Sequence, residues 1–571
     1  MGLRATLLVT AATLWASSAL AQPAVELTPT DESAWDIPGE LLVDFADDTE
    51  ASDIRDVLRR LAVSFAPTAL EDETKVEIVR AAPSRMDELR ARLAADPRVE
   101  IVEPNARVRA SFVPDDPLYK EQWHLTRVGA ERAWSFSTGR GVTVAVVDTG
   151  IACEDFPPFS KASDLNLTRC VPGYNFVAKN EHAADDQGHG THVAGTIAQS
   201  TNNAIGAAGV AFEARLMPVK VLSSGGWGTL SDVADGIRWA ADHGAQVINL
   251  SLGGPRDSKI LERAVAHARE KGVVVVAAAG NSGGRVEFPG GTAGVIGVSA
   301  TDSKDRLAWF SSRGPGVDIA APGVGVIQQT ICNGGRNGCE TFPSLSGTSM
   351  ASPHVAGVAA LLVSLGVTEP DAVQRALESS AEPIDRSPGG KKKFGAGLLS
   401  AQGGVSRVAL RQVLTRLLAL AALIFVVFRW ARRKGPVQSP WHPSFLVPAL
   451  ATGPGLLFFA PFLLPRTSDV VDAFARPIAD LDLLLDASLH GFLPLANVAL
   501  PLVLTLVFLG VPGSRRPLAG VALGTAAYLA SVIVLGNVYS PVGSAVLTAW
   551  CAVNALACML LARLVLARTV S

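Results

Sequence analysis

Through the middle of the chain, short runs of β-branched and apolar residues alternate with stretches in which apolar residues recur at helical spacing. Strands that are apolar throughout are typical of parallel sheets covered on both faces. The alternation predicts an α/β domain with a doubly wound parallel sheet and right-handed crossovers, which we place at residues 111–407. Its strands are expected at 142–147, 215–221, 247–252 and 273–278, and its helices at 230–243, from His189 and from Lys259.

Upstream, residues 22–110 predict a small α+β unit. Alternating apolar residues indicate strands, and apolar residues three and four apart indicate helices between them. The strands are expected at 40–45, 76–79 and 99–102, and the helices around 54–61 and 86–93.

After residue 407 the chain becomes strongly apolar, which accounts for the mean hydropathy of +0.29 and the 48% hydrophobic content. A spanning helix needs about 20 apolar residues, so residues 408–571 predict an all-α bundle of about five transmembrane helices. The cationic residues from Arg432 to Lys434 and at Arg515 and Arg516 predict the cytoplasmic side, and put the α/β domain on the opposite side of a cell membrane. The spans are expected at 414–430, 445–464, 491–510, 518–536 and 544–566.

Residues 1–21 have the features of a secretory signal peptide: Arg4, an apolar stretch, and an Ala-x-Ala cleavage pattern that ends at Ala21. Export leads to an oxidising compartment in which cysteines pair. Two close pairs are disulfide candidates, although spacing alone proves neither pairing. They are Cys153 with Cys170 and Cys332 with Cys339.

A glycine turn at Gly347 delivers Ser349 to the start of an apolar helix that runs through Val363. The first turn of a helix has unpaired N–H groups and the positive end of the helix dipole, which favour developing negative charge. Pro353 is expected in this first turn, where no internal hydrogen bond is lost. The alternative interpretation is a simple N-cap serine.

Two further segments supply an acid and a base. Asp148 follows the strand at 142–147, and ligands of parallel sheets lie beyond the carboxyl ends of the strands. His189 follows a glycine turn at the start of another helix. A hydroxyl becomes a strong nucleophile when a base takes its proton and an acid fixes the tautomer of that base. Asp148, His189 and Ser349 are therefore the candidate catalytic residues.

Two other kinds of enzyme share parts of this pattern. The Asp-Thr-Gly at Asp148 also occurs in aspartic peptidases, but they need a second such motif, and the Asp-Ser-Lys at Asp302 lacks the glycine. His189 and His192 have the spacing of paired metal ligands, but no His-Glu-x-x-His frame accompanies them. We expect His192 to be a core histidine.

The order Asp148, His189, Ser349, each within a glycine-containing motif, resembles that of the subtilisin-like serine peptidases. The resemblance extends over residues 111–407 and implies a subtilisin-like fold and a serine endopeptidase acting on polypeptides. It implies Ser349 as the nucleophile, His189 as the general base and Asp148 as the group that orients the base. Asn281, in an Ala-Ala-Ala-Gly-Asn segment, matches the side-chain donor to the oxyanion.

The same resemblance implies how a substrate binds. Two glycine-containing segments match those that sandwich an extended substrate strand, and backbone pairing of this kind leaves side-chain pockets to select the sequence. The implied substrate-binding residues are Gly226, Trp227, Gly228, Ser251, Leu252, Gly253, Ala279 and Gly280.

P1 is the substrate residue before the scissile bond. By the resemblance, Glu287 lies in the segment that forms the wall of the P1 pocket, where this wall reaches the base of the pocket. A buried carboxylate there needs a cationic partner, so we hypothesise a preference for lysine or arginine at P1. Arg107 and Arg109 lie in the expected processing region, as self-cleavage would require.

The resemblance implies that the chemistry needs no cofactor, but a structural calcium ion is one expectation. Asn203 matches a calcium loop of the family. The carboxylate expected after the strand at 142–147 is not cleanly in place, because Asp155 stands in a changed sequence, and calcium binds six or more oxygens.

Directly before such a domain, residues 22–110 resemble the family's ferredoxin-like inhibitory propeptide, which assists folding and leaves by self-cleavage, so the enzyme would be made as a zymogen. Two rival functions remain: a catalytically silent peptide-binding receptor, and a membrane-domain function that the peptidase regulates. Membrane lipid is an expected partner, and Asn497 or Asn554 could dock a membrane protein. The net charge of −3 argues against nucleic acid as a partner.

Overall fold

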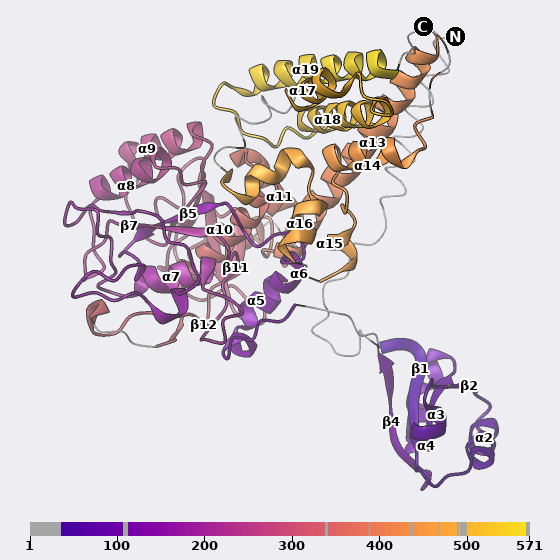
Figure 1. Ribbon diagram of the computed structural model, residues 1–571. Helices are drawn as coiled ribbons and strands as arrows, with labels where there is room; N and C mark the ends of the chain where they lie inside the picture. The colour runs from indigo at the N-terminus through magenta and orange to yellow at the C-terminus, as the bar shows by residue number, and fades with distance from the viewer. Residues whose placement is uncertain are drawn as a thin grey trace. The chain divides into compact units, whose positions relative to one another are not determined.

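The computed structural model describes residues 36–106, 112–336, 341–387, 389–433, 435, 437, 439–465, 468–487, 490 and 499–566 (Figure 1). The predicted signal peptide, Arg107, Arg109, Cys339 and Asn497 lie outside these residues. By its internal contacts the chain divides into two compact units, residues 1–110 and 111–571.

The first unit is an antiparallel four-stranded sheet, in the order β2-β3-β1-β4, with two main helices. Leu58 and Leu89 of these helices are fully buried against Val43 and Val79 of the sheet. The chain order βαββαβ is that of a ferredoxin-like unit. The sequence analysis missed β2, a short edge strand without apolar alternation. The elements are β1 (Asp36–Phe45), α2 (Ala51–Arg60), β2 (Ser64–Pro67), α3 (Glu71–Thr74), β3 (Val76–Arg80), α4 (Met86–Ala94) and β4 (Val99–Ala106).

The second unit is built on a seven-stranded sheet in the order β11-β10-β9-β8-β5-β7-β6, in which every pairing is parallel. This confirms the predicted doubly wound α/β domain. The four predicted strands are present as β5, β7, β8 and β9, whereas the other three were missed because they are short or interrupted by glycine and serine. The strands are β5 (Thr143–Asp148), β6 (Tyr174–Asn175), β7 (Arg215–Lys220), β8 (Val247–Leu250), β9 (Val274–Ala278), β10 (Ile296–Thr301) and β11 (Ile319–Pro322), and a separate hairpin pairs β12 (Val326–Ile327) with β13 (Ser344–Leu345).

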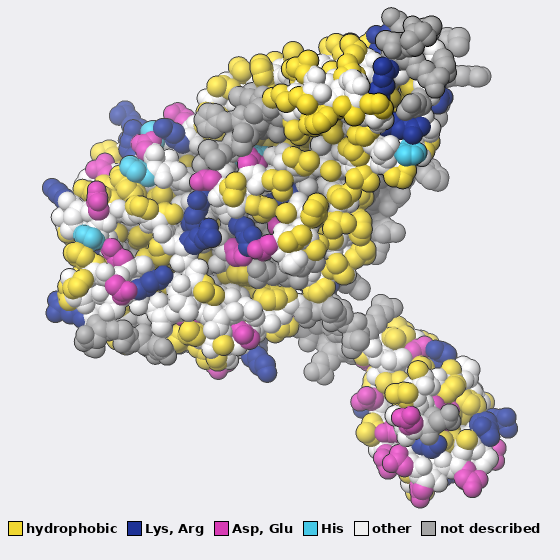
Figure 2. Space-filling model, viewed as in Figure 1, with side chains coloured by type: hydrophobic (Ala, Val, Ile, Leu, Met, Phe, Trp, Pro, Cys, Tyr) yellow, Lys and Arg dark blue, Asp and Glu magenta, His cyan; other side chains and the backbone are white. Residues whose placement is uncertain are grey.

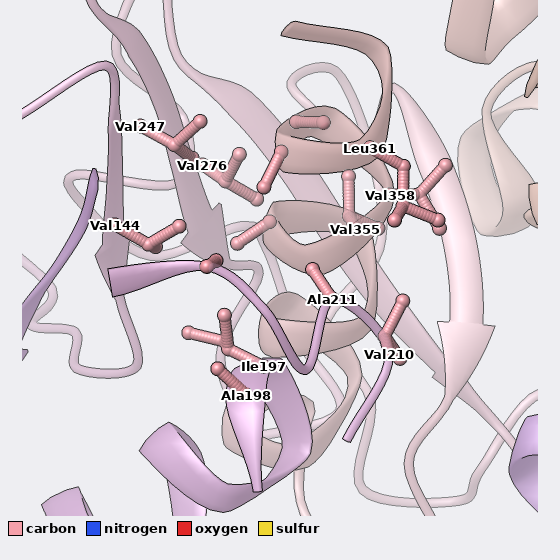
Figure 3. Close-up of a cluster of buried hydrophobic side chains, with 14 of the residues drawn as sticks. Val144, Ile197, Ala198, Val210, Ala211, Val247, Val276, Val355, Val358 and Leu361 are labelled. Carbon is pink, nitrogen blue, oxygen red and sulfur yellow. The ribbon is translucent and has the colours of Figure 1, made fainter. Parts of the chain in front are cut away.

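Helices cover both faces of this sheet. On one face, α8 (Leu230–Asp242) and α9 (Lys259–Glu270) are amphipathic and bury their apolar sides on the strands. On the other lie α7 (His189–Ala198) and α10 (Thr348–Ser364), which is buried almost throughout. Figure 3 shows Val355 and Val358 of α10 among side chains of the strands and of α7. Smaller helices are α5 (Trp123–Val128), α6 (Ala130–Ala133), α11 (Pro370–Ser380) and α12 (Lys391–Phe394).

A single long helix, α13 (Ala401–Arg432), joins the α/β domain to the apolar C-terminal part. Ala401 and Val405 of this helix belong to the α/β core, so the boundary predicted at residue 407 lies inside a continuous helix. The later helices are α14 (Pro443–Thr452), α15 (Ala460–Leu463), α16 (Asp469–Ala475), α17 (Ala499–Phe508), α18 (Arg515–Leu535) and α19 (Ser544–Leu566).

Three of the described helices, α13, α18 and α19, are long and apolar enough to cross a membrane. Hydrophobic side chains cover the face of this region seen in Figure 2. The predicted span at 445–464 is not one helix, because Gly453, Pro454 and Gly455 separate α14 from α15. The predicted span at 491–510 lies partly outside the described residues, and α17 is its described part. The number of five spans stays a prediction.

Two segments between the C-terminal helices pack against the α/β domain. In residues 468–487, Asp469 pairs with Arg140 (2.9 Å) and Asp486 with Arg215 (3.2 Å), while Leu483 is buried in the α/β core. After α18, the Tyr539 hydroxyl donates to the carbonyl of Glu270 (2.6 Å). The C-terminal part is therefore docked on the α/β domain through both segments.

Candidate active site

Asp148 is the last residue of β5 and is fully buried. Its position at the carboxyl end of a strand next to β7 and β8 follows from the fully apolar sequence that precedes it. Asp148 Oδ1 accepts hydrogen bonds from the N–H of Thr149 (2.7 Å) and from His189 Nδ1 (2.7 Å). Asp148 Oδ2 has no hydrogen-bond partner in the described part of the chain. The carboxylate is therefore fixed, desolvated and directed at one imidazole.

His189 begins α7 after Gly188, whose φ of +110° favours glycine. Asp185, which the sequence analysis passed over, holds the turn before it. Its Oδ1 accepts from Gly188 N (2.9 Å), and its Oδ2 accepts from both the N–H (2.9 Å) and the hydroxyl (2.6 Å) of Thr191. A buried carboxylate that accepts several backbone bonds makes this turn rigid, so the direction of the His189 ring is fixed.

The environment of His189 changes its basicity. Burial lowers the pKa of the imidazole, but attraction to Asp148, the hydrogen bond with Asp148 and the charge of Asp185 outweigh burial, and the net pKa is raised above 6.5. About a quarter of the His189 side chain (26%) stays exposed, so the ring faces solvent on one side and Asp148 on the other. This is an arrangement in which an imidazole can accept a proton.

Ser349 is the second residue of α10 and is half-buried. Pro353 lies in the second turn of this helix, so the prediction that it costs no internal hydrogen bond was wrong. In a regular helix the N–H of residue 353 would donate to the carbonyl of Ser349, but proline has no N–H, so this hydrogen bond is absent. The Ser251 hydroxyl takes that place at 2.8 Å. The Ser349 hydroxyl donates in return to the carbonyl of Ser251 (3.2 Å), and no hydrogen bond among the described residues joins it to His189.

Asn281 lies beside the start of α10. Its Oδ1 accepts from the N–H (2.9 Å) and the hydroxyl (2.9 Å) of Thr348. These two bonds fix the orientation of the amide and leave its Nδ2 group as a donor. Asn281 is exposed, so this donor is accessible to a bound substrate or to solvent.

Two of the predicted substrate-binding segments contact the start of α10, and a third forms a turn at residues 226–228. Trp227 is 82% exposed, in a turn where Gly226 has a φ of +76° and Ser223 N–H donates to the carbonyl of Trp227 (2.9 Å). Gly228 completes that turn, and Leu252 is partly buried next to Ser251. Gly280 N–H donates to the Thr348 hydroxyl (3.2 Å). The structure thus places the segments of Ser251 and Gly280 next to the start of α10.

Glu287 lies between two of these segments. Its N–H donates to the carbonyl of Ala279 (2.9 Å), which brings the side chain beside Gly280. A Cβ atom at Gly253 would be 3.0 Å from Oε2 of Glu287, and one at Gly280 would be 2.7 Å from Oε1. The carboxylate is half-buried and makes no hydrogen bond or ion pair with a described residue. A side chain at either glycine would therefore have to displace this carboxylate.

Comparison with known proteins agrees with this geometry. The subtilase family model matches residues 139–404. A thermophilic serine proteinase of Bacillus sp. strain AK1 is 38% identical over 362 residues, which are 63% of this chain and 86% of that protein. The chain belongs to the subtilase family. Subtilisin Savinase of Lederbergia lenta is 44% identical over 283 residues (49% and 97%), and an extracellular protease of Xanthomonas campestris pv. campestris is 36% identical over 365 residues (56% and 61%).

One of the two predicted disulfides of the subtilase domain is formed, between Cys153 and Cys170. Cys332 is also disulfide-bonded, and Cys339 lies outside the described residues, so that pairing stays a prediction. Cys551 and Cys558 of α19 are free and buried.

Two carboxylates that the sequence analysis did not assign contact the predicted calcium loop. Asn203 Nδ2 donates to Asp164 Oδ1 (2.9 Å), and the N–H of Asn202 donates to Asp116 Oδ2 (2.7 Å). Burial raises the pKa of Asp164 to about 7 and raises that of Asp116. Asp155, which stands where the family's carboxylate is not cleanly in place, accepts a hydrogen bond from the N–H of Lys161 at the surface. Among the described residues, no three His, Cys, Asp or Glu side chains are grouped to hold a metal ion.

His192 is fully buried, as expected, with Nε2 near the carbonyl of Val326 (3.2 Å). Two further buried histidines pair nearby: His124 Nδ1 and His354 Nε2 are 2.8 Å apart. Burial lowers the pKa of His192 and of His354 to about 4, and burial together with repulsion from its neighbours lowers that of His124 well below 6.5. These rings are therefore neutral core residues of the subtilase domain.

Proposed function

We propose that this subtilase is a membrane-tethered serine endopeptidase that uses Asp148, His189 and Ser349 and is made as a zymogen. The observation that carries the proposal is the 2.7 Å hydrogen bond between His189 Nδ1 and the buried carboxylate of Asp148. It leaves His189 Nε2 as the basic atom of the ring. The helices α7 and α10 that carry His189 and Ser349 pack against one another in one core.

In the proposed reaction, the Ser349 hydroxyl turns from the Ser251 carbonyl to His189 Nε2 and attacks the substrate carbonyl. His189 takes the proton and then gives it to the leaving amine, while Asp148 stabilises the imidazolium. The oxyanion receives hydrogen bonds from Asn281 Nδ2 and from the Ser349 N–H, which has no helical acceptor at the second position of α10. Water then hydrolyses the acyl-enzyme by the same path. No step requires a cofactor.

The position of Glu287 supports a preference for lysine or arginine at P1. Its half-buried carboxylate lies between Gly253 and Gly280 and has no described cationic partner. A P1 side chain that ends in a positive charge would supply that partner, and a charge-assisted bond in a partly desolvated pocket is stronger than one at the surface.

Contacts of the C-terminal part support five crossings with the peptidase outside. The segment at residues 468–487 and Tyr539 both contact the peptidase domain, which supports placing both on its side of the membrane. The chain crosses away from that side along α13 and returns before residue 468. It crosses away again before Arg515 and returns before Tyr539. The guanidinium carbon of Arg563 lies 3.9 Å from the centre of the Trp430 ring. Both residues lie near the C-terminal ends of their helices, at the ends away from the peptidase domain, where cationic residues favour the cytoplasm. A relative that is named an extracellular protease agrees with this side.

We also propose that residues 22–110 are the inhibitory propeptide. The ferredoxin-like unit at residues 36–106 has its own core and precedes the peptidase domain directly. Self-cleavage between this unit and residue 112 would release it, and Arg107 or Arg109 would fit the preference that Glu287 predicts.

A structural calcium ion fits the Asn203 loop. Asp116 and Asp164 are buried, repel one another, and pair with no Lys or Arg among the described residues. A bound cation would compensate this repulsion, and carboxylate and amide oxygens are the ligands that calcium prefers. Asp116, Asp164 and Asn203 would hold the ion, which would stabilise the fold without entering the chemistry.

Labelling with a fluorophosphonate tests the enzymatic proposal. The detergent-solubilised full chain is expected to be labelled, and the Ser349→Ala variant, purified in the same way, is not. Absence of label in a folded parent protein would favour a silent peptide-binding receptor. The other rival, a membrane-domain function, is tested by truncating the chain after Arg407. A truncated chain that keeps peptidase activity but does not complement the phenotype of a deletion strain would favour it.

A further inference from the structure

A cavity of about 600 Å³ lies where α11 of the peptidase domain meets the start of α13 and the end of α18. This volume is within the range of about 300–1,000 Å³ that is typical of ligand pockets. Apolar side chains such as Val408 and Leu535 form part of its wall, and three arginines and one glutamate are its charged groups. The site described above does not use this cavity.

The cavity has an excess of positive charge. The side chains of Arg375 from α11 and Arg411 from α13 are exposed and make no hydrogen bond or ion pair with a described residue, whereas the Arg407 side chain donates one hydrogen bond to the carbonyl of Ser379 (2.7 Å). The one lining carboxylate, Glu378, accepts from Gln374 (2.8 Å) instead of pairing with an arginine. Glu369 is a further acidic neighbour of Arg375. Guanidinium groups bind phosphate in a bidentate manner, so a phosphate matches this charge.

The arginines lie at the head of an apolar stripe. Arg407, Arg411, Leu414 and Leu418 repeat at spacings of four and three residues, which places them on one face of α13. Leu414 is 37% and Leu418 is 69% exposed. Because α13 is long and apolar enough to cross a membrane, this stripe would face lipid next to the cationic cavity. A ligand with an anionic head and an acyl chain matches both parts at once.

We propose that this cavity binds an anionic phospholipid. The phosphate lies among Arg375, Arg407 and Arg411, and an acyl chain follows Leu414 and Leu418 along α13. Because α11 belongs to the peptidase domain and α13 and α18 to the membrane part, the lipid stabilises the docking of one on the other. Basic pockets beside transmembrane helices are a known way to recognise lipid headgroups. The inference rests on the placement of α13 in a membrane and is independent of the catalytic residues.

The experiment uses the full chain with Ser349→Ala, to prevent self-cleavage, in a non-ionic detergent. Dioleoylphosphatidylglycerol, dioleoylphosphatidylcholine and inorganic phosphate are titrated separately, and binding is followed by native mass spectrometry and by the unfolding temperature. We expect phosphatidylglycerol to bind and to raise the unfolding temperature. In the double variant Arg407→Gln/Arg411→Gln, the apparent Kd should rise at least about tenfold, that is, by about 1.4 kcal/mol.

The matched control replaces two exposed helical arginines away from the cavity, Arg238→Gln and Arg263→Gln, and should bind phosphatidylglycerol like the parent. Glu378→Gln removes the opposing charge and should tighten binding two- to threefold, which gives a second readout if the arginine variant does not fold. Equal effects of phosphatidylcholine, an equal effect of free phosphate, or unchanged affinity in the arginine variant and in Glu378→Gln would each overturn the proposal.

Discussion

Ser251 and Ser349 exchange two hydrogen bonds: the Ser251 hydroxyl donates to the carbonyl of Ser349 (2.8 Å), and the Ser349 hydroxyl donates to the carbonyl of Ser251 (3.2 Å). The first bond compensates for the missing N–H of Pro353, and the second is the bond that the hydroxyl of the proposed nucleophile must give up to bond with His189. The substrate-binding segment at Ser251 is thereby linked to the start of α10.

Ser251→Ala is expected to lower stability, because the carbonyl of Ser349 is left without a donor. An unsatisfied buried carbonyl costs about 1–3 kcal/mol. The check is the unfolding temperature in a Ser349→Ala background. In a Pro353→Ala chain the helix regains its own N–H donor, so the same Ser251→Ala change should cost less there. Additive losses in the double variant would contradict this explanation.

The pH dependence of hydrolysis should follow His189. Its net pKa is raised, and only the neutral imidazole accepts a proton, so kcat/KM should rise with pH through a midpoint above 6.5. Asp148→Asn should lower kcat by about 10⁴-fold, because the wrong tautomer of His189 is then favoured. Steady-state kinetics from pH 5 to pH 9 measure both effects. A midpoint well below 6.5 in the parent enzyme would mean that another group limits the rate.

Glu287→Gln should change the selection at P1. We expect kcat/KM for a peptide with arginine at P1 to fall about 10- to 100-fold, while a peptide with leucine there is cleaved at least as well. Glu181→Gln, at an exposed loop position, is the matched control. The mature N-terminus, mapped by mass spectrometry, is an independent readout, since a residue other than arginine or lysine before the cut would contradict the preference.

The buried pair of His124 and His354 should make the domain sensitive to acid. Both pKa values are lowered in the folded state, so the unfolded chain binds more protons as the pH falls below about 6.5. With a folded pKa of about 4, His354 alone accounts for about 2 kcal/mol of lost stability at pH 5. The decrease in unfolding temperature between pH 7 and pH 5 should be shallower in His124→Gln, and a parallel decrease would rule the pair out as its cause.

Calcium should stabilise the fold through Asp116 and Asp164. A chelator is expected to lower the unfolding temperature of the parent chain, and added calcium should restore it. Asp164→Asn should be nearly insensitive to both additions, because one anionic ligand is lost. Asp155→Asn, at the surface, is the matched control and should respond like the parent. If the parent chain did not respond to the chelator, the calcium proposal would be contradicted, and protonation would be the way in which the buried carboxylates are neutralised.

Much of the fold could be predicted, because local patterns of apolar residues indicate most of its strands and helices. The apolar runs at 142–147 and 273–278 can be buried only within a covered sheet, and they form β5 and β9. The strands β10 and β11 escaped prediction because glycine, serine and proline interrupt them, and their pairing partners stabilise them instead. The predicted span at 445–464 failed as a single helix at a Gly-Pro-Gly break that overall hydropathy does not register.

For this protein, the sequence by itself determined the chemical types and their order: a carboxylate after a buried strand, a histidine and a serine each at a helix start, and an amide between them. These are local properties, because a glycine turn and an apolar run act within a few residues. Only the tertiary structure decided that Ser251 replaces the donor lost at Pro353, that Asp164 rather than Asp155 reaches the Asn203 loop, and that arginines of α11 and α13 share one cavity. Such contacts join residues far apart in the chain, and packing, which no local pattern encodes, sets their distances.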